Sequence, residues 1–349
     1  MSSPIPPPRE FSRLGQVSVP RIWTGLWQLS SSAWGSADLD DIKKISEHSQ
    51  FAIPLGVFDT SQADHYGPAE SIVGDFARQL PDSSKLYIAT KWCVFHKCIP
   101  TREVVLEAVK GRLRGLQTKR IDLLQFHWQD YNDKAYLDAL YHLQCLQLEG
   151  YISNIGLCNF DTKHVDEICT QLGPGAIVSN QVQFSIIDTR PLHGMGDVCM
   201  KHDVKLLTYG TLCGNFLSDR WLGQPSPDPY GEEVVLTPSQ RKYLDIILIS
   251  WGSWELFQSL LRVLRLIGDR HGGLSIANIA MRWVLDHPFV GGVLIGARLG
   301  ITEHFTDNAK VFNFRLSPQD RADIEEILAR SNSRRLITTI GDCGAEYRA

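Results

Sequence analysis

The sequence predicts a single (β/α)8 barrel, in which eight parallel strands alternate with helices and a long loop follows the seventh strand. Short apolar runs rich in β-branched residues alternate with helical patterns along almost the whole chain. Eight strand candidates occur in order, and no Gly-x-Gly-x-x-Gly fingerprint follows the first, as it often does in an open, doubly wound sheet. The length of 349 residues fits one barrel with insertions.

Each expected strand is a short apolar run that is separated from the next by a helical pattern. Parallel neighbours require such crossover segments, so this order favours βαβ units throughout. The expected strands are residues 22–29, 57–60, 86–92, 121–128, 152–159, 176–184, 205–209 and 292–296.

The helices between these strands are marked by amphipathic patterns and by capping residues. Thr101 precedes one helix as a suitable N-cap, and Ser317 with Asp320 three residues later can cap the last helix from both sides. The expected helices are residues 38–48, 69–79, 102–117, 135–149, 162–171, 193–202, 275–286, 303–311 and 318–331.

The segments outside this alternation are one long loop and the two ends. Residues 213–274 form an insertion after the seventh strand, with helical runs around 239–268. Loops at the carboxyl rim of such barrels carry function, but this one contains no interpretable motif. Residues 1–18 are expected to be an N-terminal extension and 333–349 a C-terminal tail of the single domain.

Composition narrows the class of partner. Lys and Arg total 35 against 39 Asp and Glu, without a basic block, which argues against nucleic acid. The start of the chain lacks the apolar stretch of a secretory signal, and no apolar run approaches the ~20 residues of a membrane span. The eight scattered cysteines fit reduced thiols in a cytoplasmic protein. Cys93, His96 and Cys98 offer three metal ligands without an evident fourth, so we expect no metal.

Four polar residues follow or end strand candidates: Asp59, Tyr66, Lys91 and His127. Strand ends of a barrel converge on one mouth, so these side chains can meet there. Hydride addition to a carbonyl puts negative charge on oxygen, and a tyrosine can supply the proton if a cation stabilises its anion. Lys91 can be that cation, Asp59 can keep it charged, and His127 can bind the carbonyl oxygen.

Each of these residues also has an ordinary structural explanation. A lysine at a strand end is often a surface charge, and an aspartate often caps the next helix. A tyrosine in a loop or a histidine in an apolar strand is often a packing residue. The four in this order favour the catalytic interpretation.

The motifs around these residues resemble the aldo-keto reductase family from about residue 20 to residue 330. The Asp and Tyr, the Lys and the His each lie in a stretch similar to a family motif. Further stretches resemble the family's nicotinamide strands and dinucleotide loops. The matching stretches are 58–70 (FDTSQADHYGPAE), 88–91 (IATK), 123–128 (LLQFHW), 155–160 (IGLCNF), 179–183 (SNQVQ), 207–214 (LTYGTLCG), 293–300 (VLIGARLG) and 307–308 (DN).

The resemblance implies that Tyr66 is the general acid, tuned by Lys91, and that the cofactor is NADP(H). Guanidinium pairs well with a 2′-phosphate, which gives Arg298 a physical reason to favour NADP(H), although a solvated surface charge is the alternative. The implied cofactor contacts comprise the first strand (Gly25, Trp27), Asp59, the nicotinamide amide (Cys158, Asn159, Gln181), the nicotinamide ring (Tyr209), the pyrophosphate (Gly210, Leu212, Gly214) and the adenosine end (Gly296, Ala297, Arg298, His304, Asn308).

Two departures from the family pattern stand out. Ser61 and Gln62 are inserted, so Asp59 lies seven positions before Tyr66 instead of the usual five. We expect the longer loop to bulge outward and leave Asp59, and not Asp64, against Lys91. Cys158 replaces the usual serine, and sulfur is a weak hydrogen-bond partner, so we expect the nicotinamide to be held slightly less tightly.

Three tryptophans, Trp34, Trp92 and Trp128, are expected to face the mouth and line an apolar substrate pocket. The alternative is that these aromatic residues only close the barrel. The expected function is reduction of an aldehyde or ketone, or oxidation of the alcohol, on a small-molecule substrate. Two alternatives stay open: a cofactor-binding regulatory subunit similar to potassium-channel beta subunits, and a barrel recruited for dehydration or isomerisation.

Overall fold

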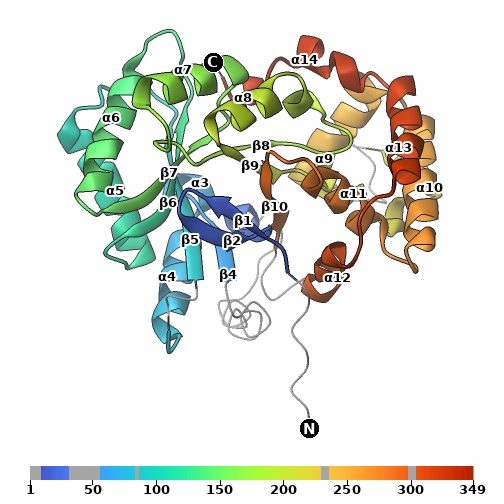
Figure 1. Cartoon of the computed structure of the whole chain (residues 1–349), viewed down its shortest axis with the longest axis horizontal. Helices are drawn as coiled ribbons and strands as arrows, with labels where there is room; N and C mark the ends of the chain where they lie inside the picture. The colour runs from blue at the N-terminus through green and yellow to red at the C-terminus, as the bar shows by residue number, and fades with distance from the viewer. Residues whose placement is uncertain (1–8, 31–55, 83–85, 229–235, 298–303, 349) are drawn as a thin grey trace.

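The computed structural model describes residues 9–30, 56–82, 86–228, 236–297 and 304–348. Eight parallel strands close into a barrel in the order β10-β3-β4-β5-β6-β7-β8-β9, with helices around it (Figure 1), which confirms the predicted architecture. The strands are β3 (Ile22–Gly25), β4 (Gly56–Asp59), β5 (Leu86–Val94), β6 (Ile121–Trp128), β7 (Ile152–Cys158), β8 (Ser179–Gln183), β9 (Lys205–Tyr209) and β10 (Val290–Gly296).

The helices follow the predicted pattern, including their capping. The Thr101 hydroxyl accepts from the Val104 N–H at 3.4 Å, and Ser317 with Asp320 forms a reciprocal capping box. The helix expected at 38–48 lies outside the described residues. The others are α3 (Ala63–Tyr66), α4 (Ala69–Gln79), α5 (Arg102–Leu116), α6 (Ala135–Leu148), α7 (Thr162–Leu172), α8 (Met195–His202), α9 (Pro238–Asp245), α10 (Trp254–Arg270), α11 (Ile276–Leu285), α12 (Phe305–Ala309), α13 (Pro318–Arg330) and α14 (Leu336–Thr339).

An antiparallel hairpin, β1 (Phe11–Leu14) and β2 (Val17–Pro20), precedes the barrel. Leu14 and Val19 are fully buried in one cluster with apolar residues from β3 to β6, β9 and β10 and with Val178, which precedes β8. Residues 1–18 were expected to be an N-terminal extension, and most of this hairpin lies within them. Four-residue strands carry too little pattern to predict, although covering the barrel's apolar interior makes the hairpin part of the fold.

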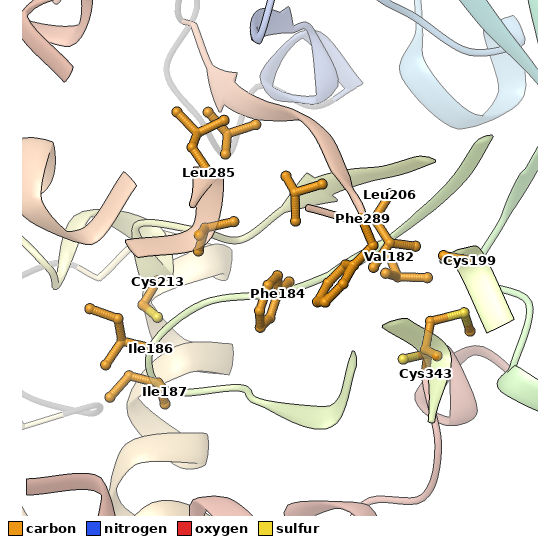
Figure 2. Close-up of a cluster of buried hydrophobic side chains, with 14 of the residues drawn as sticks. Val182, Phe184, Ile186, Ile187, Cys199, Leu206, Cys213, Leu285, Phe289 and Cys343 are labelled. Carbon is orange, nitrogen blue, oxygen red and sulfur yellow. The ribbon is translucent and has the colours of Figure 1, made fainter. Parts of the chain in front are cut away.

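The apolar core has two layers, one inside the barrel and a larger one between strands and helices. Figure 2 shows part of the outer layer, in which the ring centroids of Phe184 and Phe289 lie 6.1 Å apart beside Val182. Successive strand residues alternate between the two layers. This alternation decides which side chains reach the functional site.

The long loop after β9 contains α9, a π-helical turn (Ile246–Trp251) and α10. Phe216 packs against Trp221, Trp254 and Phe257, with ring centroids between 4.8 and 6.3 Å apart. The tryptophans of this loop therefore stabilise the loop itself. None of the described helices is long and apolar enough to cross a membrane.

The chain after α13, where a C-terminal tail was expected over 333–349, folds back onto the domain in its described part. It forms α14 and then passes α7, where the Thr162 N–H donates to Asp342 Oδ2 at 2.9 Å. In Figure 1 the C-terminus lies beside α7 and α8. The end of the chain thereby reaches the carboxyl ends of the barrel strands.

Candidate active site

Three of the four predicted catalytic residues meet at the ends of β4 and β5. Asp59 is the last residue of β4, Lys91 lies in β5, and Tyr66 ends the short helix α3. Lys91 Nζ lies 2.5 Å from Asp59 Oδ2 and 4.7 Å from the centroid of the Tyr66 ring. Lys91 Nζ also donates to the Thr60 carbonyl at 3.1 Å. The predicted contact between Asp59 and Lys91 is confirmed.

The charges of this cluster follow from its burial. Burial by itself lowers the pKa of Lys91, but the carboxylate of Asp59 outweighs it, and the pKa lies above its usual value. Burial raises the pKa of Tyr66 well above its usual value, while the charge of Lys91 acts in the opposite direction. At neutral pH, Lys91 is therefore charged and Tyr66 carries its proton.

His127 lies on the inner face of β6 and is joined to Tyr66 by a row of rings. The centroid of Phe95 lies 5.5 Å from that of His127 and 5.4 Å from that of His65, which in turn lies 4.9 Å from Tyr66. Burial lowers the pKa of His127 to about 3, so its imidazole is neutral at neutral pH. A neutral imidazole can donate one hydrogen bond to a carbonyl oxygen.

The second oxygen of Asp59 belongs to a buried amide network that sequence reasoning missed. Asp59 Oδ1 accepts from Gln125 Nε2 at 2.7 Å and from Gln181 Nε2 at 2.8 Å. Gln181 Nε2 also donates to Gln125 Oε1 at 2.8 Å, which leaves Gln181 Oε1 as the accepting atom of that amide. The position of Gln125, two residues before His127 in the same strand, is the signal that could have revealed it.

The inserted residues lie inside the protein, which corrects the expected outward bulge. Ser61 is fully buried and Gln62 is 6% exposed. Gln62 Nε2 donates to the Cys93 carbonyl at 3.1 Å, and the Cys93 N–H donates to Gln62 Oε1 at 2.8 Å. A side-chain amide carries a donor and an acceptor, so it can pair with a strand end as a backbone amide does.

The residues implied at the nicotinamide lie at the ends of β7, β8 and β9. Tyr209 ends β9, and its hydroxyl donates to Asn159 Oδ1 at 2.9 Å. Asn159 directly follows β7 in the left-handed region, with φ of 59°. Cys158 is the last residue of β7, and burial raises the pKa of its thiol. These side chains and Gln181 present amide and aromatic groups that fit a nicotinamide.

The turn after β9 has the close-packed glycines that a pyrophosphate turn needs. Gly210 and Gly214 adopt φ of 70° and 62°, which side-chain-bearing residues rarely do. A Cβ on Gly210 would come within 2.0 Å of the Tyr243 hydroxyl. Leu212 lies between these glycines and is half-buried. Backbone amides can approach phosphate oxygens in such a turn.

The residues implied near the first and last strands lie side by side. Gly25 and Gly296 pair in register, and the Ala297 N–H donates to the Gly25 carbonyl at 3.0 Å. A Cβ on Gly296 would come within 1.9 Å of Gln28 Nε2, so a side chain at this corner would displace the Gln28 amide. Trp27 starts the next turn and is 40% exposed.

The adenosine-side residues are described in part. Asn308 is buried in α12, and its N–H donates to the carbonyl of His304, which precedes the helix. Arg298 and Trp34 lie outside the described residues. Their assignments to the 2′-phosphate and to the substrate stay predictions.

The structure does not bring Trp92 and Trp128 to the mouth. Both lie on the outer face of their strands, where the Phe126 ring is 5.2 Å from Trp92 and 5.8 Å from Trp128. Their neighbours Lys91 and His127 point inward, and successive residues of a strand point to opposite faces. The expected pocket role of these two tryptophans is therefore corrected, and they close the core.

The C-terminal segment, which we define as residues 341–348, covers the β7–β9 side of the mouth. Arg348 donates to the Asn159 carbonyl at 3.2 Å and pairs with Asp161 at 3.1 Å. The Tyr347 ring meets His127 edge to face at 6.2 Å, and its hydroxyl accepts from Lys242 at 3.0 Å. This segment therefore supplies an aromatic wall that the sequence did not reveal.

An ion-pair cluster anchors the C-terminal segment. Glu346 pairs with Arg190 at 2.8 Å, and Arg190 is itself held by Asp188 at 2.7 Å. The Arg190 side chain is 1% exposed and that of Glu346 is 21% exposed. A guanidinium shared by two carboxylates is a strong, directional anchor.

Comparison with known proteins agrees with this geometry. The sequence model of the Aldo/keto reductase family matches residues 21–329. The Aldo-keto reductase YhdN of Bacillus subtilis is 24% identical over 91% of this chain and 92% of its own length. Methylglyoxal reductase DkgA of Escherichia coli is 23% identical with the same coverage.

Solved structures show the same fold. The glycerol dehydrogenase AKR11B4 from Gluconobacter oxydans is similar with a TM-score of 0.73 at 22% identity, over 92% of this chain and 95% of that one. An aldo-keto reductase from Klebsiella pneumoniae in complex with NADPH has a TM-score of 0.67 at 20% identity, with the same coverage. The chain belongs to the aldo-keto reductase family, as its motifs predicted.

Proposed function

We propose that this chain is an NADP(H)-dependent oxidoreductase that reduces an aldehyde or ketone to an alcohol, or catalyses the reverse, with Tyr66 as the proton donor. The observation that carries the proposal is the buried pair of Lys91 and Asp59 against the Tyr66 ring. A charged lysine beside a protonated tyrosine is suited to giving a proton to a developing alkoxide and to stabilising the phenolate that remains.

The chain's own residues then divide the work. Tyr66 gives its hydroxyl proton to the carbonyl oxygen, and Lys91 stabilises the resulting anion. Asp59 keeps Lys91 charged in a buried site. Neutral His127 donates a hydrogen bond to the same oxygen and orients the carbonyl. A bound nicotinamide cofactor would supply hydride donation to, or acceptance from, the reacting carbon.

The cofactor site follows from the described geometry. Asn159 and Gln181 would bind the nicotinamide amide, and Tyr209 would stack on the ring. The turn from Gly210 to Gly214 would pass the pyrophosphate, with its left-handed glycines bringing backbone amides close. The structurally similar aldo-keto reductase from Klebsiella pneumoniae was solved in complex with NADPH, which supports a nicotinamide dinucleotide as the cofactor. Another relative, from Escherichia coli, is named an NADH-specific methylglyoxal reductase, so similarity to these proteins does not by itself decide between NADPH and NADH. The proposed preference for NADPH therefore rests on Arg298.

The proposed substrate is a small carbonyl compound or alcohol, bound between Tyr66 and the ring row of His65, Phe95, His127 and Tyr347. The proposed location is the cytoplasm. All eight cysteines are free thiols, and free thiols persist in a reducing compartment.

Turnover of NADPH with a panel of aldehydes and ketones tests the proposal. We expect cofactor oxidation that depends on the carbonyl compound, followed through the cofactor's absorbance. Cofactor binding without turnover of any compound would instead indicate a regulatory subunit. Conversion of a substrate without net cofactor oxidation would indicate dehydration or isomerisation.

A further inference from the structure

We propose that Gln62 is a positioning residue for Tyr66, so that the inserted pair Ser61–Gln62 is a working part of the site. The proposal rests on the proposed function of Tyr66 as the proton donor. It assigns to Gln62 the task of tying the helix that carries Tyr66 to the strand that carries Lys91.

The Gln62 side chain continues the sheet where β4 has ended. The last paired residues of β4 and β5 are Asp59 and Ala89. Cys93 lies four residues further along β5, beyond this pair. Gln62 Oε1 accepts from its N–H at 2.8 Å and Gln62 Nε2 donates to its carbonyl at 3.1 Å. One side chain therefore pairs with β5 as a strand neighbour would, four residues beyond the last backbone pair.

The Gln62 backbone is bonded to the short helix α3, which carries Tyr66. Its carbonyl accepts from the N–H groups of His65 and Tyr66, both at 2.9 Å. These bonds form the turn that begins α3 and ends at Tyr66. A single residue is thus bonded through its side chain to β5 and through its backbone to the catalytic tyrosine.

Lys91 and Cys93 lie two positions apart in β5, so their side chains share the inner face. A bond to the Cys93 backbone therefore fixes Gln62 at a set distance from Lys91. The loop between Asp59 and Gln62 is fixed on the same edge, since the Thr60 N–H donates to the Ala89 carbonyl at 2.8 Å. Displacement of Tyr66 from Lys91 would weaken both proton transfer and stabilisation of the phenolate.

The buried position of Gln62 makes this tie specific. With 6% exposure, the amide has little access to water that could replace its bonds to Cys93. Deletion of Ser61 and Gln62 should therefore impair turnover by removing the tie.

The experiment compares Gln62→Met with Gln258→Met. Methionine keeps the length of the side chain and removes both hydrogen bonds. Gln258 is a matched control, because it is also 6% exposed, accepts from the Gly223 N–H at 2.7 Å and donates to the Trp221 carbonyl at 2.8 Å. It lies in α10, in the long loop after β9.

We expect Gln62→Met to lower kcat by about 10- to 100-fold, since a displacement of about 1 Å can cost 100-fold. The Kd for NADPH should stay within about twofold of the unsubstituted protein, and so should the KM for the carbonyl compound. Gln258→Met should lower thermal stability to a similar extent and leave kcat unchanged. Equal kcat values for Gln62→Met and the unsubstituted protein, or equal losses in both variants, would overturn the proposal.

Hydrogen exchange separates this proposal from the proposed function. In Gln62→Met, the His65 and Tyr66 amides should exchange faster, while those of β5 near Lys91 stay protected. If the unsubstituted protein turns over no carbonyl compound, the proposed function fails. The positioning role of Gln62 fails separately if the Tyr66 amide of Gln62→Met exchanges at the same rate as in the unsubstituted protein. Faster exchange confined to this segment would support it without any turnover.

Discussion

The two sides of the barrel mouth are built in different ways. On the β4–β5 side, Asp59, Tyr66 and Lys91 are held by backbone and side-chain bonds among residues 59–93. On the β7–β9 side, Asn159 and Tyr209 lie beneath the C-terminal segment, whose residues come from the far end of the chain. The first side is buried and is local in sequence apart from the bonds that Asp59 accepts from Gln125 and Gln181, whereas the second depends on long-range ion pairs.

This difference suggests that the β4–β5 side serves proton transfer and the β7–β9 side serves cofactor binding. The ion pair of the β4–β5 side is at most 2% exposed, so salt screens it little. The ion pairs of the C-terminal segment include partly exposed partners, such as Glu346 at 21%. Changes on the first side should therefore alter proton transfer, and changes on the second should alter cofactor binding. The following substitutions test that division.

The largest effect is expected for Tyr66→Phe, which removes the hydroxyl and little else. Carbonyl reduction should fall by at least ~100-fold, the lower range for the loss of a general acid. The Kd for NADPH should be almost unchanged, because the hydroxyl serves the substrate. Tyr141→Phe, at a 61% exposed position, is the control. Reduction at the original rate by Tyr66→Phe would remove Tyr66 from the proposed mechanism.

Asp59→Asn tests the buried ion pair. One oxygen of Asp59 accepts from Lys91 and the other from Gln125 and Gln181. Whichever way the new asparagine amide is turned, its NH₂ group faces a donor, either Lys91 or the two glutamine amides. Lys91 also loses its counter-charge. We expect a strong fall in kcat and a loss of about 3 kcal/mol in the free energy of unfolding. Steady-state kinetics and denaturant unfolding measure these.

The control for this substitution is Asp64→Asn in α3, five residues further along the chain, which should be mild. The opposite ranking of the two variants would show that the β4–β5 side relies on another carboxylate. Equal cofactor affinity in both variants would support the division between the two sides.

The β4–β5 side was also the more predictable from sequence, because its residues lie in short motifs at strand ends. The same period of two explains the errors. Gln125 could be placed beside His127, and Trp92 and Trp128 had to face outward, once their strand neighbours pointed into the barrel. The role of Gln62 was unexpected because its side chain, and not its backbone, pairs with β5. The alternation of residues along a strand gives no sign of such a contact.

On the β7–β9 side, the sequence predicted the residues at the strand ends but not the C-terminal segment that covers them. Asn159 and Tyr209 end strands and carry recognisable motifs. The C-terminal segment consists of short turns without periodicity, and its contacts join residues such as Asn159 and Arg348 that are 189 positions apart. Pairing over that distance depends on the folded barrel, so the sequence pattern could not reveal it.

Arg298→Ala tests whether cofactor preference can be changed without an effect on proton transfer. If its guanidinium pairs with the 2′-phosphate, NADPH binding should weaken by roughly 1.5–3 kcal/mol, the range for a hydrogen bond to a charged group. NADH binding should change little, so NADH serves as the internal control. Fluorescence titration of both cofactors measures this. Equal losses for the two would contradict the phosphate contact, and an unchanged kcat at saturating NADPH would confirm that the proton-transfer side is unaffected.

The smallest effect is expected for Glu346→Gln, which loosens the C-terminal segment. Burial by itself raises the pKa of Glu346, but Arg190 outweighs it, and the pKa lies below its usual value of 4.5. The folded protein thus favours the ionised carboxylate, so its contribution to stability is present above pH 4.5 and is lost as the pH falls through the lowered pKa. For a partly exposed pair we expect about 1 kcal/mol at neutral pH.

Unfolding of Glu346→Gln and the unsubstituted protein should therefore differ at neutral pH and converge in acid. Glu325→Gln is the control, since its pair with Arg334 is more than half exposed on both sides and should contribute little at any pH. Because the C-terminal segment covers Asn159, Glu346→Gln should weaken NADPH binding by up to about fivefold, the equivalent of 1 kcal/mol, with kcat unchanged. Tighter NADPH binding would mean instead that the C-terminal segment obstructs the cofactor, and a lower kcat would mean that the two sides of the mouth are coupled.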